Sequence, residues 1–162
     1  MNKRIEELIE RLGLIEHEEG GYFFRIFYSD NTVFSNRHKK ERRALSSIYF
    51  LLTKDNSVSR FHKLQSDEIW HFYEGDMLRL HIVDEKGLEY RSLTIGSKTE
   101  EISYCAVVPA NCWQAAETVG EYSLVGCSVA PAFEYDDFVM LQDIAYTKEK
   151  IITRFPELKR FV

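Results

Sequence analysis

Residues 59–76 read SRFHKLQSDEIWHFYEGD, and this stretch decides the fold. It holds two short runs rich in aromatic residues, separated by polar residues and closed by a glycine-containing turn signal. Side chains two positions apart on a strand share a face of the sheet. We therefore expect Glu68, Trp70 and Phe72 to face one way and His71 the other, unless a bulge at the start of the strand reverses this order.

Similar runs continue along the chain on both sides of this stretch. Signals rich in Asp, Asn and Gly separate the runs, and residues 78–83 alternate apolar with polar side chains. Strands this short, without helices between them, favour an antiparallel sandwich or barrel. The predicted strands cover residues 22–28, 43–53, 57–63, 68–73, 77–83, 88–95, 102–108, 112–117 and 121–129.

Helical patterns stand only at the two ends. Apolar residues at helical spacing from Ile5 to Leu12 predict an amphipathic helix, with Asn2 placed to cap its start and Gly13 to end it. After Pro131 the strand pattern loosens, and short helices are expected outside the barrel. We therefore predict a single domain, residues 1–162, with an N-terminal helix (1–15), a β-barrel (20–130) and a C-terminal helical segment (131–162).

Composition and charge narrow the class of protein. The 162 residues are 44% hydrophobic and 29% charged, which is typical of a globular protein. With 21 basic and 26 acidic residues the net charge is −5, which argues against binding nucleic acid. The basic run at residues 37–43 is interpreted as a solvated loop, although a phosphate-bearing ligand would also suit it. Neither a membrane span nor a signal peptide is evident, so we expect a cytoplasmic protein without a membrane partner.

Three cysteines, Cys105, Cys112 and Cys127, are an odd number without CxxC spacing. This pattern argues against a disulfide framework and against a cysteine zinc site. Each is expected to be a reduced, buried thiol with no essential role.

Two spaced motifs point to a known family. His62 is followed six positions later by Glu68, and Pro109-Ala110-Asn111 is followed by Gln114. This spacing resembles the two motifs of the cupin superfamily, in which three histidines and a glutamate converge on a divalent metal inside a β-barrel. Leu64 stands at the second histidine position and Gln114 at the third. Asn111 replaces a turn glycine, a change that its tolerance of left-handed backbone allows.

Most of the chain resembles one cupin subfamily, the DUF985 (Cupin 5) group. The resemblance implies an all-β cupin double-stranded β-helix, or jelly-roll barrel, that is similar in fold to the sugar-nucleotide 3,5-epimerases. It also implies a homodimer, with residues 22–28 and Arg25 as candidates for the contact. Members of this group are mostly structures without an assigned activity. The matching segments are residues 17–22, 47–52, 59–62, 66–76, 108–109, 113–116, 124–131, 133 and 137–138.

The predicted barrel interior has the composition of a small-molecule site, because a few polar groups lie among aromatic walls. A histidine beside a glutamate in such a cavity suits general acid–base chemistry, so His62 and Glu68 are the predicted catalytic residues. Tyr73 is the predicted proton donor from the opposite side, with Tyr49 and Tyr104 as alternatives. No role is expected for the remaining histidines of the loops and sheet exterior, His17, His38 and His81. The predicted ligand-binding residues are Trp70, Phe72, Gln114, Trp113, Arg60 and Tyr49.

A bound metal is not expected. A neutral amide is a weak ligand and Leu64 donates nothing, so a divalent ion would have only His62, Glu68 and Gln114 to hold it. We therefore expect no cofactor and a small-molecule partner. Three functions stay open: a metal-independent isomerase or epimerase of a sugar or small metabolite, a non-catalytic binding or sensing module, and a metal-dependent cupin enzyme. In a further alternative, His62 and Glu68 form only a structural hydrogen-bonded pair.

Overall fold

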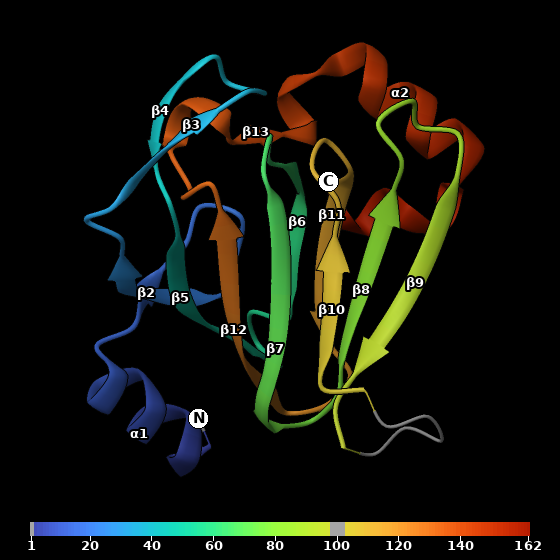
Figure 1. Ribbon diagram of the computed structural model, residues 1–162. Coiled ribbons are helices and arrows are strands. Elements are labelled where there is room, and N and C mark those ends of the chain that lie inside the picture. Colours follow the sequence, from blue (N-terminus) through green and yellow to red (C-terminus); the bar gives the residue numbers. More distant parts are fainter. Residues whose placement is uncertain (1, 98–102) are drawn as a thin grey trace.

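Two antiparallel sheets face each other in the computed structural model, which describes residues 2–97 and 103–162 (Figure 1). A short hairpin of β3 (Thr32–Ser35) and β4 (Lys40–Arg43) stands beside them. The architecture is the predicted all-β jelly roll with helices at both ends. One sheet has the strand order β1 (Ile15–Glu16), β2 (Tyr22–Tyr28), β5 (Ser46–Thr53), β12 (Tyr122–Ala130), β7 (Asp67–Gly75) and β10 (Cys105–Val108), and the other has the order β13 (Val139–Met140), β6 (Val58–Lys63), β11 (Trp113–Thr118), β8 (Leu78–Val83) and β9 (Tyr90–Ile95).

All nine predicted strands are present, with small changes at their ends. The predicted strand 43–53 begins at Ser46, because Arg43 belongs to β4. Residue 102, the predicted start of another strand, lies outside the described residues, and that strand is β10. The sequence patterns missed the short β1 and β13 and the β3–β4 hairpin.

The main core lies between the two sheets. Alternation along β7 buries Glu68, Trp70 and Phe72 and leaves Ile69 and Tyr73 exposed, as the period of two predicts. β12 pairs with both β5 and β7 at the centre of its sheet. The buried apolar residues of this core include Phe50, Leu52, Trp70, Leu78, Leu80, Ile82, Ile95 and Val125.

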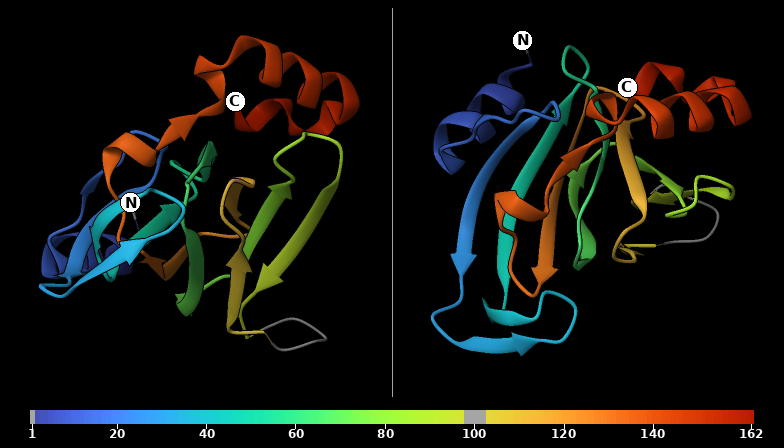
Figure 2. Two further views of the ribbon diagram at one scale, coloured as in Figure 1. Left: turned by 45° about the horizontal axis from the view of Figure 1, so that its top comes forward. Right: turned by 90° about the horizontal axis from the view of Figure 1, so that it is seen from above.

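The N-terminal helix α1 (Lys3–Leu12) covers one end of the six-stranded sheet (Figure 2). Asn2 caps it by accepting a hydrogen bond from the Arg4 amide, and Gly13 ends it in the left-handed conformation, with a φ of 64°. The buried face of the helix packs on Leu51 and Leu124 of the sheet. Its predicted caps and its predicted end are therefore both observed.

The C-terminal segment covers the outer face of the five-stranded sheet (Figure 2). Its turns and helices are η1 (Tyr135–Asp137), η2 (Leu141–Asp143), α2 (Ala145–Arg154) and η3 (Pro156–Phe161). None of the helices within the described ranges is long and apolar enough to cross a membrane. The packed residues of this segment and sheet include Phe61, Val83, Trp113, Leu141, Ile151, Leu158 and Phe161.

Candidate functional site

A cavity of about 400 Å³ opens between the six-stranded sheet, β6 and the segment that follows β12. Its lining is mostly apolar and aromatic, with a few polar groups, and such a lining is typical of small-molecule sites. The lining residues are Ile15, His17, Glu19, Phe23, Phe24, Arg25, Ser46, Ile48, His62, Leu64, Glu68, Trp70, Cys127, Val129, Phe133, Tyr135 and Phe138.

His62 lies on β6 and is 3% exposed. Its Nδ1 lies 2.8 Å from the backbone oxygen of Arg60. A carbonyl oxygen only accepts hydrogen bonds, so this contact assigns the proton to Nδ1 and leaves Nε2 as an acceptor. Burial lowers the pKa of His62, while the nearby Glu68 carboxyl opposes that change. The neutral imidazole therefore lines the cavity with a basic nitrogen.

Glu68 lies on β7 and is held by Gln114 of β11. The Gln114 amide nitrogen donates to the Glu68 carboxyl, and the Trp70 indole N–H donates to the Gln114 amide oxygen over 3.0 Å. Both ends of the Gln114 amide are thus occupied. Burial raises the pKa of Glu68 to about 7, although His62 lowers it in part.

A second carboxyl group, Glu19, comes from the loop between β1 and β2. It is 6% exposed, and the Ser59 hydroxyl donates to it over 2.9 Å. One Glu19 oxygen lies 3.3 Å from Nδ1 of His62 and 3.6 Å from Nδ1 of His17. Burial raises the pKa of Glu19 to about 7. We call His17, Glu19, His62 and Glu68 the inner cluster of the cavity.

The loop conformation explains why His17 and Glu19 reach the cavity. Gly20 has a φ of 107°, and a Cβ there would collide with the Val58 carbonyl oxygen, so only glycine fits this approach to β6. The Glu19 amide donates to Nδ1 of His17 over 3.2 Å, which assigns the His17 proton to Nε2. Burial lowers the pKa of His17. His17 lies in a loop, as expected, but its side chain lines the cavity.

Residues 132–138, which we call the wall segment, close one side of the cavity with Phe133, Tyr135 and Phe138. The Phe138 ring centroid lies 5.3 Å from that of His62 and 6.0 Å from that of His17. The inner cluster is therefore packed against an aromatic wall that the chain builds after its last long strand.

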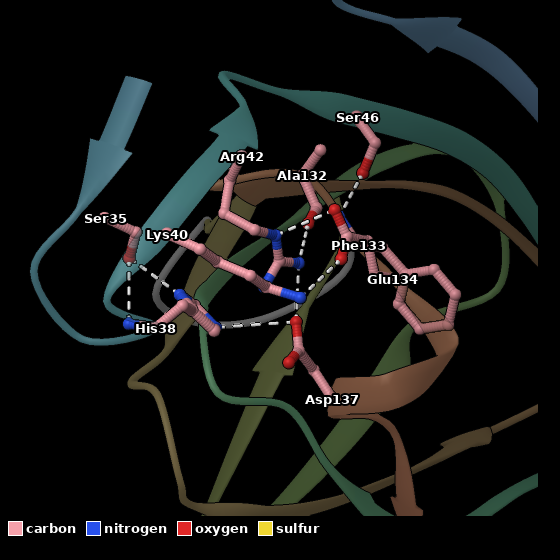
Figure 3. Close-up of polar contacts among 9 residues, drawn as sticks. All are labelled: Ser35, His38, Lys40, Arg42, Ser46, Ala132, Phe133, Glu134 and Asp137. Carbon is pink, nitrogen blue, oxygen red and sulfur yellow. Dashed lines mark hydrogen bonds and ion pairs between the residues drawn. The ribbon is translucent and has the colours of Figure 1, made fainter. Parts of the chain in front are cut away.

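A buried arginine of the β3–β4 hairpin holds the wall segment (Figure 3). The Arg42 side chain is fully buried; its guanidinium lies 2.5 Å from Asp137 and 2.9 Å from Glu134, and it donates to the Ala132 carbonyl over 2.8 Å. His38, on the same hairpin, lies 3.4 Å from Asp137. The interpretation of the basic run at residues 37–43 as a solvated loop holds for the exposed Arg37, Lys39 and Lys40 but was wrong for Arg42, which is a buried anchor.

The remaining predicted site residues lie apart from the inner cluster. Tyr49 and Tyr73 contact each other on the outer face of the six-stranded sheet, with ring centroids 5.9 Å apart and Tyr73 47% exposed. Phe72 is buried in the main core, and Trp113 packs under the C-terminal segment. Arg60 donates to the Glu18 carbonyl instead of lining the cavity.

The structure also places the two other histidines and the three cysteines, and His81 lies on the outer face of its sheet as expected. His81 is 4% exposed and lies between Tyr90 and Glu117, at 2.8 and 3.2 Å, so it is buried under the C-terminal segment. His38 lies in the turn between β3 and β4, and its side chain is buried beside Asp137. All three cysteines are free thiols, but Cys105 is exposed and only Cys127 is fully buried.

The donor set does not fit a metal ion. Within residues 2–97 and 103–162, no group of three or more His, Cys, Asp or Glu side chains is arranged to hold one. Leu64 lines the cavity where a second histidine would be needed, and both polar atoms of the Gln114 amide already have partners. We therefore derive no chemistry through a metal.

The fold agrees with comparisons to known proteins. The family model of the cupin superfamily (DUF985) matches residues 6–141. An uncharacterized protein from Saccharomyces cerevisiae, YML079W, is 28% identical over 154 residues, which cover 85% of this chain and 75% of the yeast protein. A hypothetical protein from Leishmania major is 29% identical, with a TM-score of 0.81 and 97% of each chain covered.

Two other solved structures show how far the likeness extends. Protein SO0799 from Shewanella oneidensis is 30% identical, with a TM-score of 0.79 over 96% of this chain and 92% of that one. An oxalate decarboxylase from Bacillus subtilis is 18% identical, with a TM-score of 0.59 over 91% of this chain and 36% of that one. At that identity the decarboxylase shares only the fold. The chain belongs to the DUF985 family of the cupin superfamily.

Proposed function

We propose that the cavity binds a small, partly apolar molecule and that the inner cluster moves a proton on it without a metal. One observation carries this proposal: an unprotonated imidazole nitrogen and two carboxyl groups line one cavity with aromatic walls. A lining with this many aromatic rings favours a molecule with an apolar body over an unsubstituted sugar.

The roles follow from the assigned protons. His62 accepts a proton at Nε2, because its Nδ1–H already donates to a backbone carbonyl. Glu68 and Glu19 have pKa values of about 7, so near neutral pH each is present in both protonation states and can return a proton. The acid role expected of Tyr73 therefore passes to these two carboxyl groups. Removal of a proton at one atom and its return at another is an isomerisation.

The sugar-nucleotide 3,5-epimerases remain an analogy for this chemistry, since a fold alone does not fix a reaction. The two other functions remain as alternatives. A binding or sensing module would use the same cavity without turnover. A metal-dependent enzyme would need ligands beyond His62 and Glu68, and elemental analysis of the purified protein would reveal a near-stoichiometric metal.

The test begins with the molecule that the protein itself retains. We expect mass spectrometry of the natively purified protein to reveal a bound small molecule. When that molecule is incubated with the protein in heavy water, proton transfer should exchange one of its carbon-bound hydrogens for deuterium. His62→Gln should abolish the exchange, whereas His81→Gln, at a buried histidine outside the cavity, should retain it.

Three other results would contradict part of the proposed function. Binding without exchange would favour the sensing module and contradict the proposed catalysis. A folded wild-type protein that retains no molecule and binds none of the fragments described below would contradict the site itself. Exchange that survives in a folded His62→Gln variant would remove His62 from the role of base.

We further propose a homodimer that forms through β2. Phe24, Ile26 and Phe27 of this strand are 41–50% exposed, an apolar patch that a second copy would cover. β1 pairs only with Tyr22 and Phe23, so the rest of the outer edge of β2 has no strand beside it within the described residues. Light scattering should give twice 19.1 kDa. A mass near 19.1 kDa at micromolar concentration would contradict the dimer.

A further inference from the structure

The buried carboxyl groups fall into two classes, those with an arginine partner and those without one. Within the described residues four acidic side chains are buried, namely Glu19, Glu68, Glu117 and Asp137. Glu117 lies 2.6 Å from the guanidinium of Arg160 and 3.5 Å from that of Arg79, and Asp137 lies 2.5 Å from Arg42. Glu19 and Glu68 have no such ion pair with an arginine or lysine of the described chain.

A buried carboxylate without a cation is costly, because burial removes water from the charged group. The histidines beside Glu19 and Glu68 do not supply the missing charge, since burial lowers the pKa values of both His17 and His62. Arg25 of β2 also lines the cavity, but this residue is exposed to solvent. Arg60 acts on Glu19 only at a distance and does not line the cavity, so no arginine or lysine forms an ion pair with the inner cluster within the described residues.

The inner cluster also has more acceptors than donors. Nε2 of His62 is an acceptor that no hydrogen bond from the described residues reaches, although the residue is 3% exposed. The carboxyl oxygens of Glu19 and Glu68 are acceptors whenever they are ionised. Nε2–H of His17 is the remaining imidazole donor. A group with several N–H donors would satisfy the two carboxylates, whereas an anion would be repelled by them.

The walls fit the same kind of group. Trp70, Phe133 and Phe138 line the cavity around the inner cluster, and the face of an aromatic ring attracts cations. Carboxylates at the inner end, with aromatic rings around them, are the arrangement that recognises organic cations.

We propose that the ligand of this cavity carries a cationic amine at its inner end, where the ammonium group lies between Glu19 and Glu68 and leaves Nε2 of His62 to accept the transferred proton. The inference rests on the proposed small-molecule site and names the chemical class of its ligand. The rest of the ligand is apolar and fills the space between the sheet and the wall segment.

The charge of the inner cluster sets the pH dependence. Both carboxyl groups have pKa values of about 7, so amine affinity should rise as the pH increases through that value. Affinity for a neutral molecule of the same shape should change little. The groups that face Glu19 are His17, His62, Glu18, Arg60 and Ser59, and those that face Glu68 are His62, Glu19, Gln114 and Cys127.

Three indole fragments test the proposal: tryptamine as the cation, tryptophol as the neutral match and indole-3-acetate as the anion. Titration calorimetry on the full chain should rank them in that order. At about pH 8 tryptamine should bind about tenfold or more tightly than tryptophol, as expected for charge-assisted hydrogen bonds. At about pH 6 this preference should shrink, because the carboxyl groups are then mostly protonated.

Single substitutions show which carboxyl groups produce the preference for the amine. Glu68→Gln and Glu19→Gln should each reduce the preference for tryptamine over tryptophol, whereas Glu117→Gln is the matched control at a buried carboxylate outside the cavity and should preserve it. Equal binding of tryptamine and tryptophol, or tightest binding of indole-3-acetate, would overturn the amine assignment and leave the small-molecule site intact. Failure of all three fragments to bind would overturn both.

Discussion

The inner cluster and the anchor both contact the wall segment, but only the anchor pairs its buried acid with a cation of the chain. Asp137 contacts the guanidinium of Arg42 (Figure 3). Glu68 has no arginine or lysine partner. The side chains that stabilise its charged form are the His62 imidazole, the Gln114 amide and the Cys127 thiol. The acids of the anchor form ion pairs with an arginine of the chain, whereas Glu19 and Glu68 form none with an arginine or lysine of the described residues.

This difference separates a structural role from a functional one. A paired and buried ion network fixes the position of a segment, because either partner alone would be a buried charge. Carboxyl groups that burial holds near neutrality can instead change their protonation during binding or reaction. The anchor therefore keeps the wall in place, while the inner cluster keeps the capacity to exchange protons.

The largest effect is expected at the anchor. Arg42→Met removes the buried cation from Asp137 and Glu134, and breaking such a pair should destabilise the fold by about 3–5 kcal/mol. Urea unfolding at neutral pH measures the change in the free energy of unfolding. The double variant Arg42→Met, Asp137→Asn should recover part of that loss, because the uncompensated carboxylate is gone. Loss of less than about 1 kcal/mol in Arg42→Met would show that the anchor is dispensable.

At the inner cluster, removal of a charged group should stabilise the fold at neutral pH instead of destabilising it. Burial raises the pKa of Glu68 from 4.5 to about 7, so the folded protein binds more protons than the unfolded chain between those values. In that window the raised pKa makes stability fall as the pH rises, and the loss is complete above about pH 7. Glu68→Gln removes this loss, so its stability relative to wild type should increase from about pH 5 to pH 7 by roughly 2 kcal/mol.

The free energy of unfolding of the variant is compared with that of wild type at each pH, because titration of the buried histidines changes stability in the opposite direction. Burial lowers the pKa values of His17 and His62, so their contribution to stability increases as the pH rises toward the unfolded value of 6.5. Paired chemical denaturation of wild type and Glu68→Gln at several pH values cancels that contribution. A difference that does not vary with pH would mean that Glu68 has an ordinary pKa in the folded protein.

The strands and the inward face of β7 could be predicted from the sequence, because both depend on local alternation of side chains. The same rule places Tyr73 on the face of His71, so its predicted role inside the cavity conflicted with the alternation itself. The structure follows the alternation. A resemblance to family motifs supplied His62 and Glu68, and the cavity gathers both.

The missed residues depend on contacts between distant parts of the chain. Glu19 reaches the cavity through a glycine loop that hydrogen bonds to β6, forty positions further along. The one local signal was the Gly20-Gly21 pair, which marks a close backbone approach. Arg42 looked like a solvated cation because its partners, Glu134 and Asp137, lie in a segment without strand or helix periodicity.

The smallest effect concerns the indole that orients Gln114. Trp70→Phe removes the N–H donor to the Gln114 amide oxygen, which should cost about 1 kcal/mol or somewhat more for the unsatisfied acceptor. Without that donor, the Gln114 amide is free to turn its oxygen toward Glu68, which would disfavour the charged carboxylate. The preference for tryptamine over tryptophol should therefore decrease in Trp70→Phe. Trp113→Phe is the matched control, because the Trp113 N–H has no hydrogen-bond partner among the described residues and its ring packs outside the cavity. If both variants change the preference equally, the effect comes from lost packing, and Gln114 does not tune the charge of the inner cluster.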